Sequence, residues 1–154
     1  MRDVRSMRDA LALATTSPSQ YPSLARLRAD FGDEKIETVI KLYLIDVCDM
    51  VNIKRPLREP QIEALASEIV ATYYSLSIAD IHVIFRKAKT GEYGEFYESL
   101  DMPKVMGWFR QYFDDRCAIG EQESINGKYN DATVPSESER MTRYFERLAK
   151  KKNK

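Results

Sequence analysis

The sequence predicts an all-α fold, and three observations support this. Apolar residues recur at intervals of three and four along most of the chain, which is the period of an amphipathic helix. Almost no stretch alternates strictly between apolar and polar residues, as a half-buried strand would. The chain has 154 residues, of which 44% are hydrophobic and 31% charged, enough for one ordinary domain with a buried core. We therefore expect a compact domain of about five to six helices.

The N-terminal segment predicts one short helix that adds little to the core. Its weak periodicity covers residues 4–15, and Ser and Pro at residues 17–19 then indicate a turn or linker. We expect residues 1–22 to be weakly attached and residues 23–119 to form the helical core domain.

The middle of the chain predicts four core helices. A short one over residues 24–31 ends at Gly32, and Asp33 can cap a strong helix that runs to about residue 51. Leu42 and Ile45 widen the apolar stripe of that helix, which predicts a central position for it. Pro60 suits the first turn of the next helix. The fourth runs from residue 77 to residue 89.

Ser77 and Asp80 have the spacing of a capping box, which marks the start of this fourth helix. Residues 93–100 then predict an aromatic turn or a short helix. A further helix starts at Asp101 and Pro103. Its inward residues are expected to be Val105, Trp108, Phe109, Tyr112 and Phe113.

The C-terminal part predicts a linker and one more helix. The periodicity ends around Gly120, and residues 120–135 are polar and typical of a flexible linker. Ser136 and Glu139 form a second capping box, so residues 136–154 predict a basic amphipathic helix and tail.

The composition excludes several classes of protein. The 24 basic and 24 acidic residues balance, so no net charge attracts the whole molecule to a polyanion. Two cysteines cannot form a disulfide framework or a cysteine-rich zinc site. No apolar run approaches the length that crosses a bilayer, and the first twenty residues lack the pattern of a secretory signal. We expect a cytoplasmic protein that does not bind membranes.

Residues suited to catalysis are few. His82 is the single histidine, and no serine or cysteine nucleophile stands in a recognisable setting with it, so a structural or surface role is favoured. Glu92, Glu95, Glu98 and Asp101 recur at steps of three and could face a divalent cation, although a solvated acidic face is favoured. We expect a protein that is not an enzyme and uses no cofactor or metal.

Residues suited to binding are more numerous, and two groups are candidates. The first group combines cations near a helix end with aromatic residues that could meet phosphates and unpaired bases. Its members are Arg86, Lys87, Lys89, Tyr93, Tyr97 and Lys104. The alternative is that the tyrosines fill the core and the cations are solvated near the helix C-terminus.

The second candidate group is the basic face of the last predicted helix, formed by Arg140, Arg143 and Arg147. This helix could contact nucleic acid, could keep a loosely docked segment soluble, or could enter a groove of a partner protein. We favour the partner protein. A homodimer through the same helix is also possible, by exchange between two chains.

Three segments between residues 59 and 116 resemble a family whose function is uncharacterised. They are PQIEALASEIV, LSIADIHVIFRKAKTGEYGEFYESLD and MGWFRQYFDDR. The recurrent features are Leu76 to Asp80, the turn from Gly91 to Gly94, and the stretch from Trp108 to Arg116. The family consists of small helical proteins of bacterial phages and conjugative elements. The resemblance implies a replication-accessory role by association. We therefore expect a non-enzymatic accessory protein that binds a replication or DNA-processing partner through the region from Gly91 to Trp108, with the C-terminal helix as a second candidate contact. Direct nucleic-acid binding through the first group is the alternative.

Overall fold

The structure is a computed structural model that describes residues 4–132, with side chains placed up to residue 127. Over these residues the chain forms six helices and no strand, which confirms the all-α prediction. The helices are α1 (Met7–Thr16), α2 (Leu24–Phe31), α3 (Asp33–Met50), α4 (Glu59–Thr72), α5 (Ile78–Lys89) and α6 (Met102–Ala132). The chain divides into two units, Met1–Arg116 and Cys117–Lys154, and α6 contributes residues to both.

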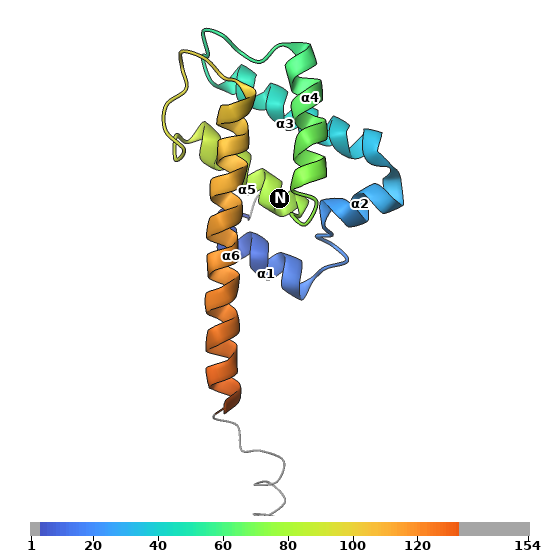
Figure 1. The fold of residues 1–154 in the computed structure, drawn as a ribbon, viewed down its shortest axis with the longest axis vertical. Helices are drawn as coiled ribbons and strands as arrows, with labels where there is room; N and C mark the ends of the chain where they lie inside the picture. Colours follow the sequence, from blue (N-terminus) through green and yellow to red (C-terminus); the bar gives the residue numbers. More distant parts are fainter. Residues whose placement is uncertain (1–3, 133–154) are drawn as a thin grey trace, which may run out of the picture. The chain divides into compact units, whose positions relative to one another are not determined.

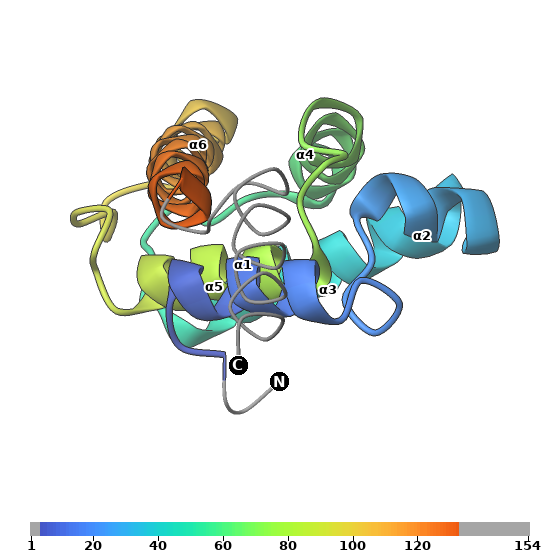
Figure 2. The ribbon, with the colours of Figure 1, turned by 90° about the horizontal axis from the view of Figure 1, so that it is seen from below.

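The helices of the first unit form two layers (Figures 1 and 2). One layer contains α1, α3 and α5, and the other contains α4 and the first half of α6. α2 packs beside α3. Seven of the twelve residues of α5 are buried, against four of the eighteen in α3. α5 is therefore the most buried helix, and α3, for which the sequence predicts a central position, packs against α2, α4 and α5.

α1 packs against α5, where the sequence predicts a weakly attached segment. Ala10 is completely buried, and Val4 and Met7 are nearly so. Ser6 caps the helix, since its hydroxyl accepts a hydrogen bond from the backbone N–H of Asp9 at 3.1 Å. These few small and medium apolar residues give a weak periodic signal, yet they complete one side of the core.

α6 continues well beyond the predicted helix end at Gly120. Residues 120–132 are helical, although the sequence predicts a flexible linker there. Gly120 and Gly127 each cost a helix roughly 1 kcal/mol relative to alanine, but neither breaks it as proline would, and the next proline is Pro135. The predicted helix from Ser136 lies outside the described residues.

The loop over residues 90–101 is neither a helix nor free in solvent. Gly91 and Gly94 both have φ near +80° to +90°, a backbone conformation that glycine adopts without strain. The backbone N–H of Lys54 donates to the carbonyl oxygen of Tyr97 at 2.9 Å, which holds the loop against the connector after α3. Two side chains of the loop, Phe96 and Leu100, are buried. The loop is therefore a fixed part of the first unit.

The carboxylate of Asp80 is completely buried and accepts four hydrogen bonds. The backbone N–H of Ser77 donates to Oδ2 at 2.9 Å, and the Ser77 hydroxyl accepts the backbone N–H of Asp80 at 3.3 Å, which together form the predicted capping box of α5. The same hydroxyl also donates to Oδ2 at 2.8 Å. The Tyr112 hydroxyl donates to Oδ1 at 2.8 Å, and Arg116 Nε donates to the same oxygen at 3.2 Å. Both donors belong to α6, so this carboxylate joins α6 to the start of α5.

We expect Tyr112→Phe to lower the free energy of unfolding by about 1–3 kcal/mol, because it leaves a buried carboxylate oxygen with one donor fewer. Urea denaturation monitored by circular dichroism measures this change. Tyr97→Phe is the matched control, since Tyr97 is 55% exposed and its loss should change stability by less than about 0.5 kcal/mol. Equal effects of the two variants would contradict a structural role for the Tyr112 hydroxyl.

Candidate functional site

Two of the predicted binding cations hydrogen-bond to backbone carbonyl groups. Arg86 Nη1 donates to the carbonyl oxygen of Arg5 at 3.0 Å, which ties α5 to the residues before α1. Lys104 Nζ donates to the carbonyl oxygen of Ser99 at 2.8 Å, near the start of α6. These contacts use part of the donor capacity that a phosphate would need.

The other two described cations form ion pairs within the chain. Lys87 Nζ lies 3.2 Å from a carboxylate oxygen of Glu92, and Lys89 Nζ lies 2.6 Å from one of Asp46. The side chains of both lysines are only about a quarter to a third exposed. Both lysines are therefore locally neutralised by carboxylates.

Tyr93 belongs to an aromatic cluster rather than to the open surface. Its ring stacks on Trp108, with 6.1 Å between centroids and 13° between planes. Phe96 also packs on Trp108, with 5.0 Å between the ring centroids. The Tyr93 hydroxyl is buried without a hydrogen-bond partner among the described residues. Burial, with smaller effects of Glu92 and Asp115, raises the pKa of Tyr93 well above its usual value.

Tyr97 is the exposed ring of the predicted patch, with 55% of its surface accessible. The structure therefore separates the two tyrosines, one in the aromatic cluster and one outside. Two rings side by side, as stacking of successive bases would need, are not formed by this pair. Arg140, Arg143 and Arg147 lie outside the described residues.

His82 is half-buried on α5 and packs edge-on against Tyr43, with 6.2 Å between ring centroids. Burial lowers the pKa of His82, and the positive charges of Lys89 and Arg86 lower it further. Among the described residues, no carboxylate is hydrogen-bonded to the imidazole, so a general base with an orienting partner is not assembled there.

The four carboxylates at steps of three do not share a helical face. Glu92, Glu95 and Glu98 lie in the loop between α5 and α6, and Asp101 caps α6 by accepting the backbone N–H of Lys104 at 3.1 Å. Over residues 4–132, no group of three or more His, Cys, Asp or Glu side chains is placed to hold a metal ion.

The surface that the sequence missed is the outer face of α3. The prediction that Leu42 and Ile45 widen the buried stripe is wrong, since they are 62% and 42% exposed. The buried residues of α3 are Ile36, Ile40, Leu44 and Val47, which follow one line along the helix. At about 100° per residue, Leu42 and Ile45 fall on the opposite side of that line. A helix with apolar residues on both sides is the signal that could have revealed this surface.

Two more exposed apolar side chains lie at the end of α3 and in the neighbouring loop. Met50, the last residue of α3, is 71% exposed, and Tyr97 is held beside Lys54 by the backbone hydrogen bond described above. We call Leu42, Ile45, Met50 and Tyr97 the α3 surface residues. Scattered exposed apolar residues are normal, but two adjacent turns of one helix carry Leu42 and Ile45.

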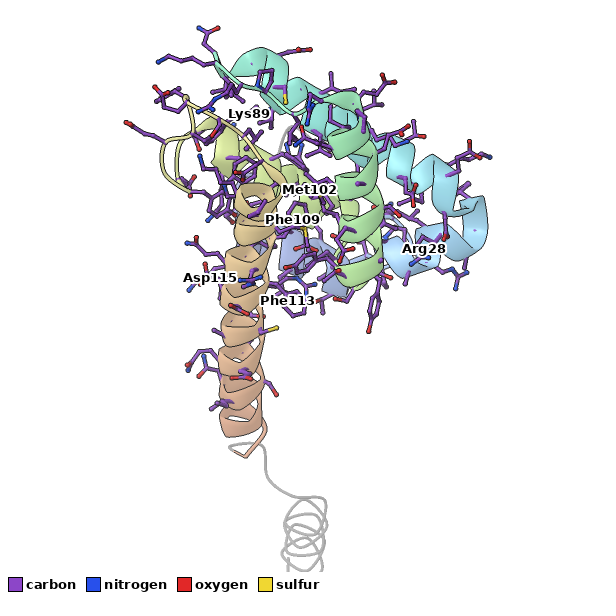
Figure 3. The ribbon with its side chains drawn as sticks, turned by 45° about the horizontal axis from the view of Figure 1, so that its top comes forward. Arg28, Lys89, Met102, Phe109, Phe113 and Asp115 are labelled. Atoms are coloured by element: carbon purple, nitrogen blue, oxygen red, sulfur yellow. The ribbon has the colours of Figure 1, made fainter. Side chains whose placement is uncertain are left out.

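Figure 3 shows that aromatic and acidic side chains of α6 lie on opposite sides of the helix. Phe109 and Phe113 lie on the side that faces α4, and Asp115 points the other way. Tyr73 at the end of α4 confirms this contact, with ring centroids 5.3 Å from Phe109 and 5.8 Å from Phe113. The aromatic residues predicted to face inward on α6 therefore build the core, and with them Trp108, which is 5% exposed.

Comparison with known proteins identifies no relative: no family model, no curated protein and no solved structure matches this chain. Over the part of the chain that the structure describes, no helix combines the length and apolar character needed to cross a membrane. The candidate binding surface is therefore argued from the geometry of the molecule itself.

We expect Trp108→Ala to lower the free energy of unfolding by about 3–5 kcal/mol, because it removes a buried ring that packs on Tyr93 and Phe96. Chemical denaturation measures this loss. Tyr97→Ala, in the same region but exposed, is the control and should cost far less. Unchanged stability of Trp108→Ala with loss of partner binding would instead make Trp108 an interface residue.

We expect the stability of the protein to rise with pH around the ordinary pKa of histidine, because His82 has a lower pKa in the folded state than in the unfolded chain. Over that window the unfolded chain binds more protons, so acid favours unfolding. In His82→Gln this component of the pH dependence should disappear. Melting temperatures of both proteins from about pH 5 to pH 7.5 test it, and parallel curves would show that His82 does not contribute.

Proposed function

We propose that this protein is a non-enzymatic accessory protein that binds a partner protein through the α3 surface residues. The observation that carries the proposal is the outer face of α3, where Leu42 is 62% exposed and Ile45 is 42% exposed. Fully burying one such side chain at an interface removes apolar surface worth roughly 1.5–3 kcal/mol. A few residues of this kind can dominate binding to a partner.

The loop after α5 adds a polar rim to the proposed interface. Glu95 is exposed in the same loop as Tyr97, and Asp49 is exposed on the outer face of α3, whereas Glu98 is paired with Lys54 at 2.7 Å. An apolar surface with an acidic rim favours a partner segment that carries both apolar and basic residues. A partner helix with one apolar face has this chemistry.

Direct nucleic-acid binding is the rival function, and the geometry gives it less support. Lys87 and Lys89 pair with carboxylates of the same chain, and the exposed loop beside them carries Glu92 and Glu95. Carboxylates near a phosphate backbone would repel it. The predicted cations of the C-terminal segment lie outside the described residues, so they remain candidates in the rival proposal.

The biological setting of the proposal rests on the resemblance between residues 59 and 116 and small helical proteins of phages and conjugative elements. The proposed partner is accordingly a replication or DNA-processing protein in the cytoplasm. A homodimer through residues 136–154 belongs to the same proposal, and light scattering of the full chain measures it directly.

We expect the double variant Leu42→Glu/Ile45→Glu to lose binding of the partner by more than about tenfold, while its stability stays within about 1 kcal/mol of the wild type. Affinity purification of the full chain from cells of its source, with quantitative mass spectrometry, measures the loss. A photo-crosslinking residue at position 42 identifies the partner that touches the surface.

The matched control is Ala64→Glu/Ala71→Glu, which adds the same two charges to exposed positions of α4. Undiminished capture by Leu42→Glu/Ile45→Glu, or an equal loss in the control, would contradict an interface on α3. Fluorescence anisotropy with DNA tests the rival: a steep salt dependence that is lost on neutralising Arg86, Lys87 and Lys89 would select nucleic-acid binding.

A further inference from the structure

The first unit contains a cavity of about 660 Å³ that is remote in sequence from the α3 surface residues. It lies between the connector after α1, the start of α2 and the start of α5, and Arg116 of α6 lines it as well. Its size is within the range of small-molecule sites.

Two arginines, Arg116 and Arg26, line this cavity. Arg116 donates through Nε to Asp80, and Arg26 donates through Nε to Asp30 at 3.1 Å. In the described part of the chain, the Nη groups of these two arginines form no hydrogen bond. The Arg116 side chain is only 19% exposed, so the surrounding structure holds its terminal nitrogens in place. A guanidinium held in one orientation, as that of Arg116 is, suits bidentate contacts with an oxyanion, whereas the Arg26 side chain is 72% exposed.

The remaining lining combines hydroxyl groups with an apolar wall. Ser19 and Ser75 supply hydroxyls, and Tyr21 with Pro22 supplies apolar surface. Asp30 is the carboxylate that lines the cavity, and it is already paired with Arg26. The charged donors of the lining are therefore two guanidinium groups, and a ligand that brings acceptor oxygens would complement them.

We propose that this cavity binds a small organic anion, with its carboxylate or phosphate at the Nη groups of Arg116 and Arg26 and its apolar body against Tyr21 and Pro22. Because Asp80 compensates the charge of Arg116, the attraction comes mainly from directed N–H donors rather than from net charge. The site is separate from the proposed partner surface and does not depend on it.

Titration of the full-length ¹⁵N-labelled protein with phenyl phosphate, benzoate and neutral benzyl alcohol tests the proposal. We expect saturable shifts of the amide signals of Ser23 and Ser77 and of the Arg116 Nε–H signal with at least one of the two anions. Tighter binding of phenyl phosphate would identify a phosphate ligand, and tighter binding of benzoate a carboxylate. Equal binding of benzyl alcohol, or no saturable shift with either anion, would overturn the proposal.

Variants separate the two arginines from the rest of the molecule. Arg116→Lys keeps the charge but loses the planar donor group, and it should weaken anion binding by about tenfold. If Arg116→Lys fails to fold, Arg26→Gln provides the test. Arg26 is exposed, so this substitution should leave the fold intact and weaken anion binding several-fold. Arg110→Gln, exposed on the same helix as Arg116 and outside the lining, is the control. Unchanged affinity in both Arg116→Lys and Arg26→Gln would also overturn the proposal.

Discussion

The buried carboxylate of Asp80 is the constraint on which the arrangement of the first unit depends. A charge with no access to water is stable only when hydrogen bonds and an opposite charge replace its hydration. Here Ser77 supplies two donors from the start of α5, and Tyr112 and Arg116 supply two from α6. Loss of any one of these partners leaves the buried carboxylate with fewer donors than it accepts from in the native fold. The position of α6 against α5 is therefore set by polar geometry as well as by apolar packing.

The same junction also fixes α2. The backbone N–H of Leu24 donates to the carbonyl oxygen of Leu76 at 2.8 Å, and Ala25 donates to that of Tyr74 at 2.8 Å. The first amides of α2 are thus satisfied by the backbone just before α5, and Ser23 faces Ser77 in an isolated bridge. Because α5 occupies the centre, α3 needs only one buried face. This leaves its outer face, with Leu42 and Ile45, accessible to another protein.

The sequence predicts the local features of this fold better than its long-range ones. The capping box of Ser77 and Asp80 follows from a spacing of three residues, and the structure confirms it. The bonds from Tyr112 and Arg116 join residues 32 and 36 positions away from Asp80, and no periodicity indicates such a pairing. The extension of α6 through Gly120 was missed because glycine weakens a helix without ending it. The sequence predicts Leu42 and Ile45 in the buried stripe because apolar character alone does not distinguish a buried side chain from an exposed one.

Arg116 connects the core of the first unit with its cavity. Its Nε donates to Asp80, and the residue lines the cavity together with Arg26, so one side chain belongs to both environments. The Asp80 contact holds the guanidinium in one orientation, which lowers the entropy that an anion would otherwise lose on ordering a free arginine. An anion bound there would add a second set of contacts to a side chain that already joins α5 and α6. Since such a ligand binds only the folded arrangement, its binding would stabilise the same junction that Asp80 organises.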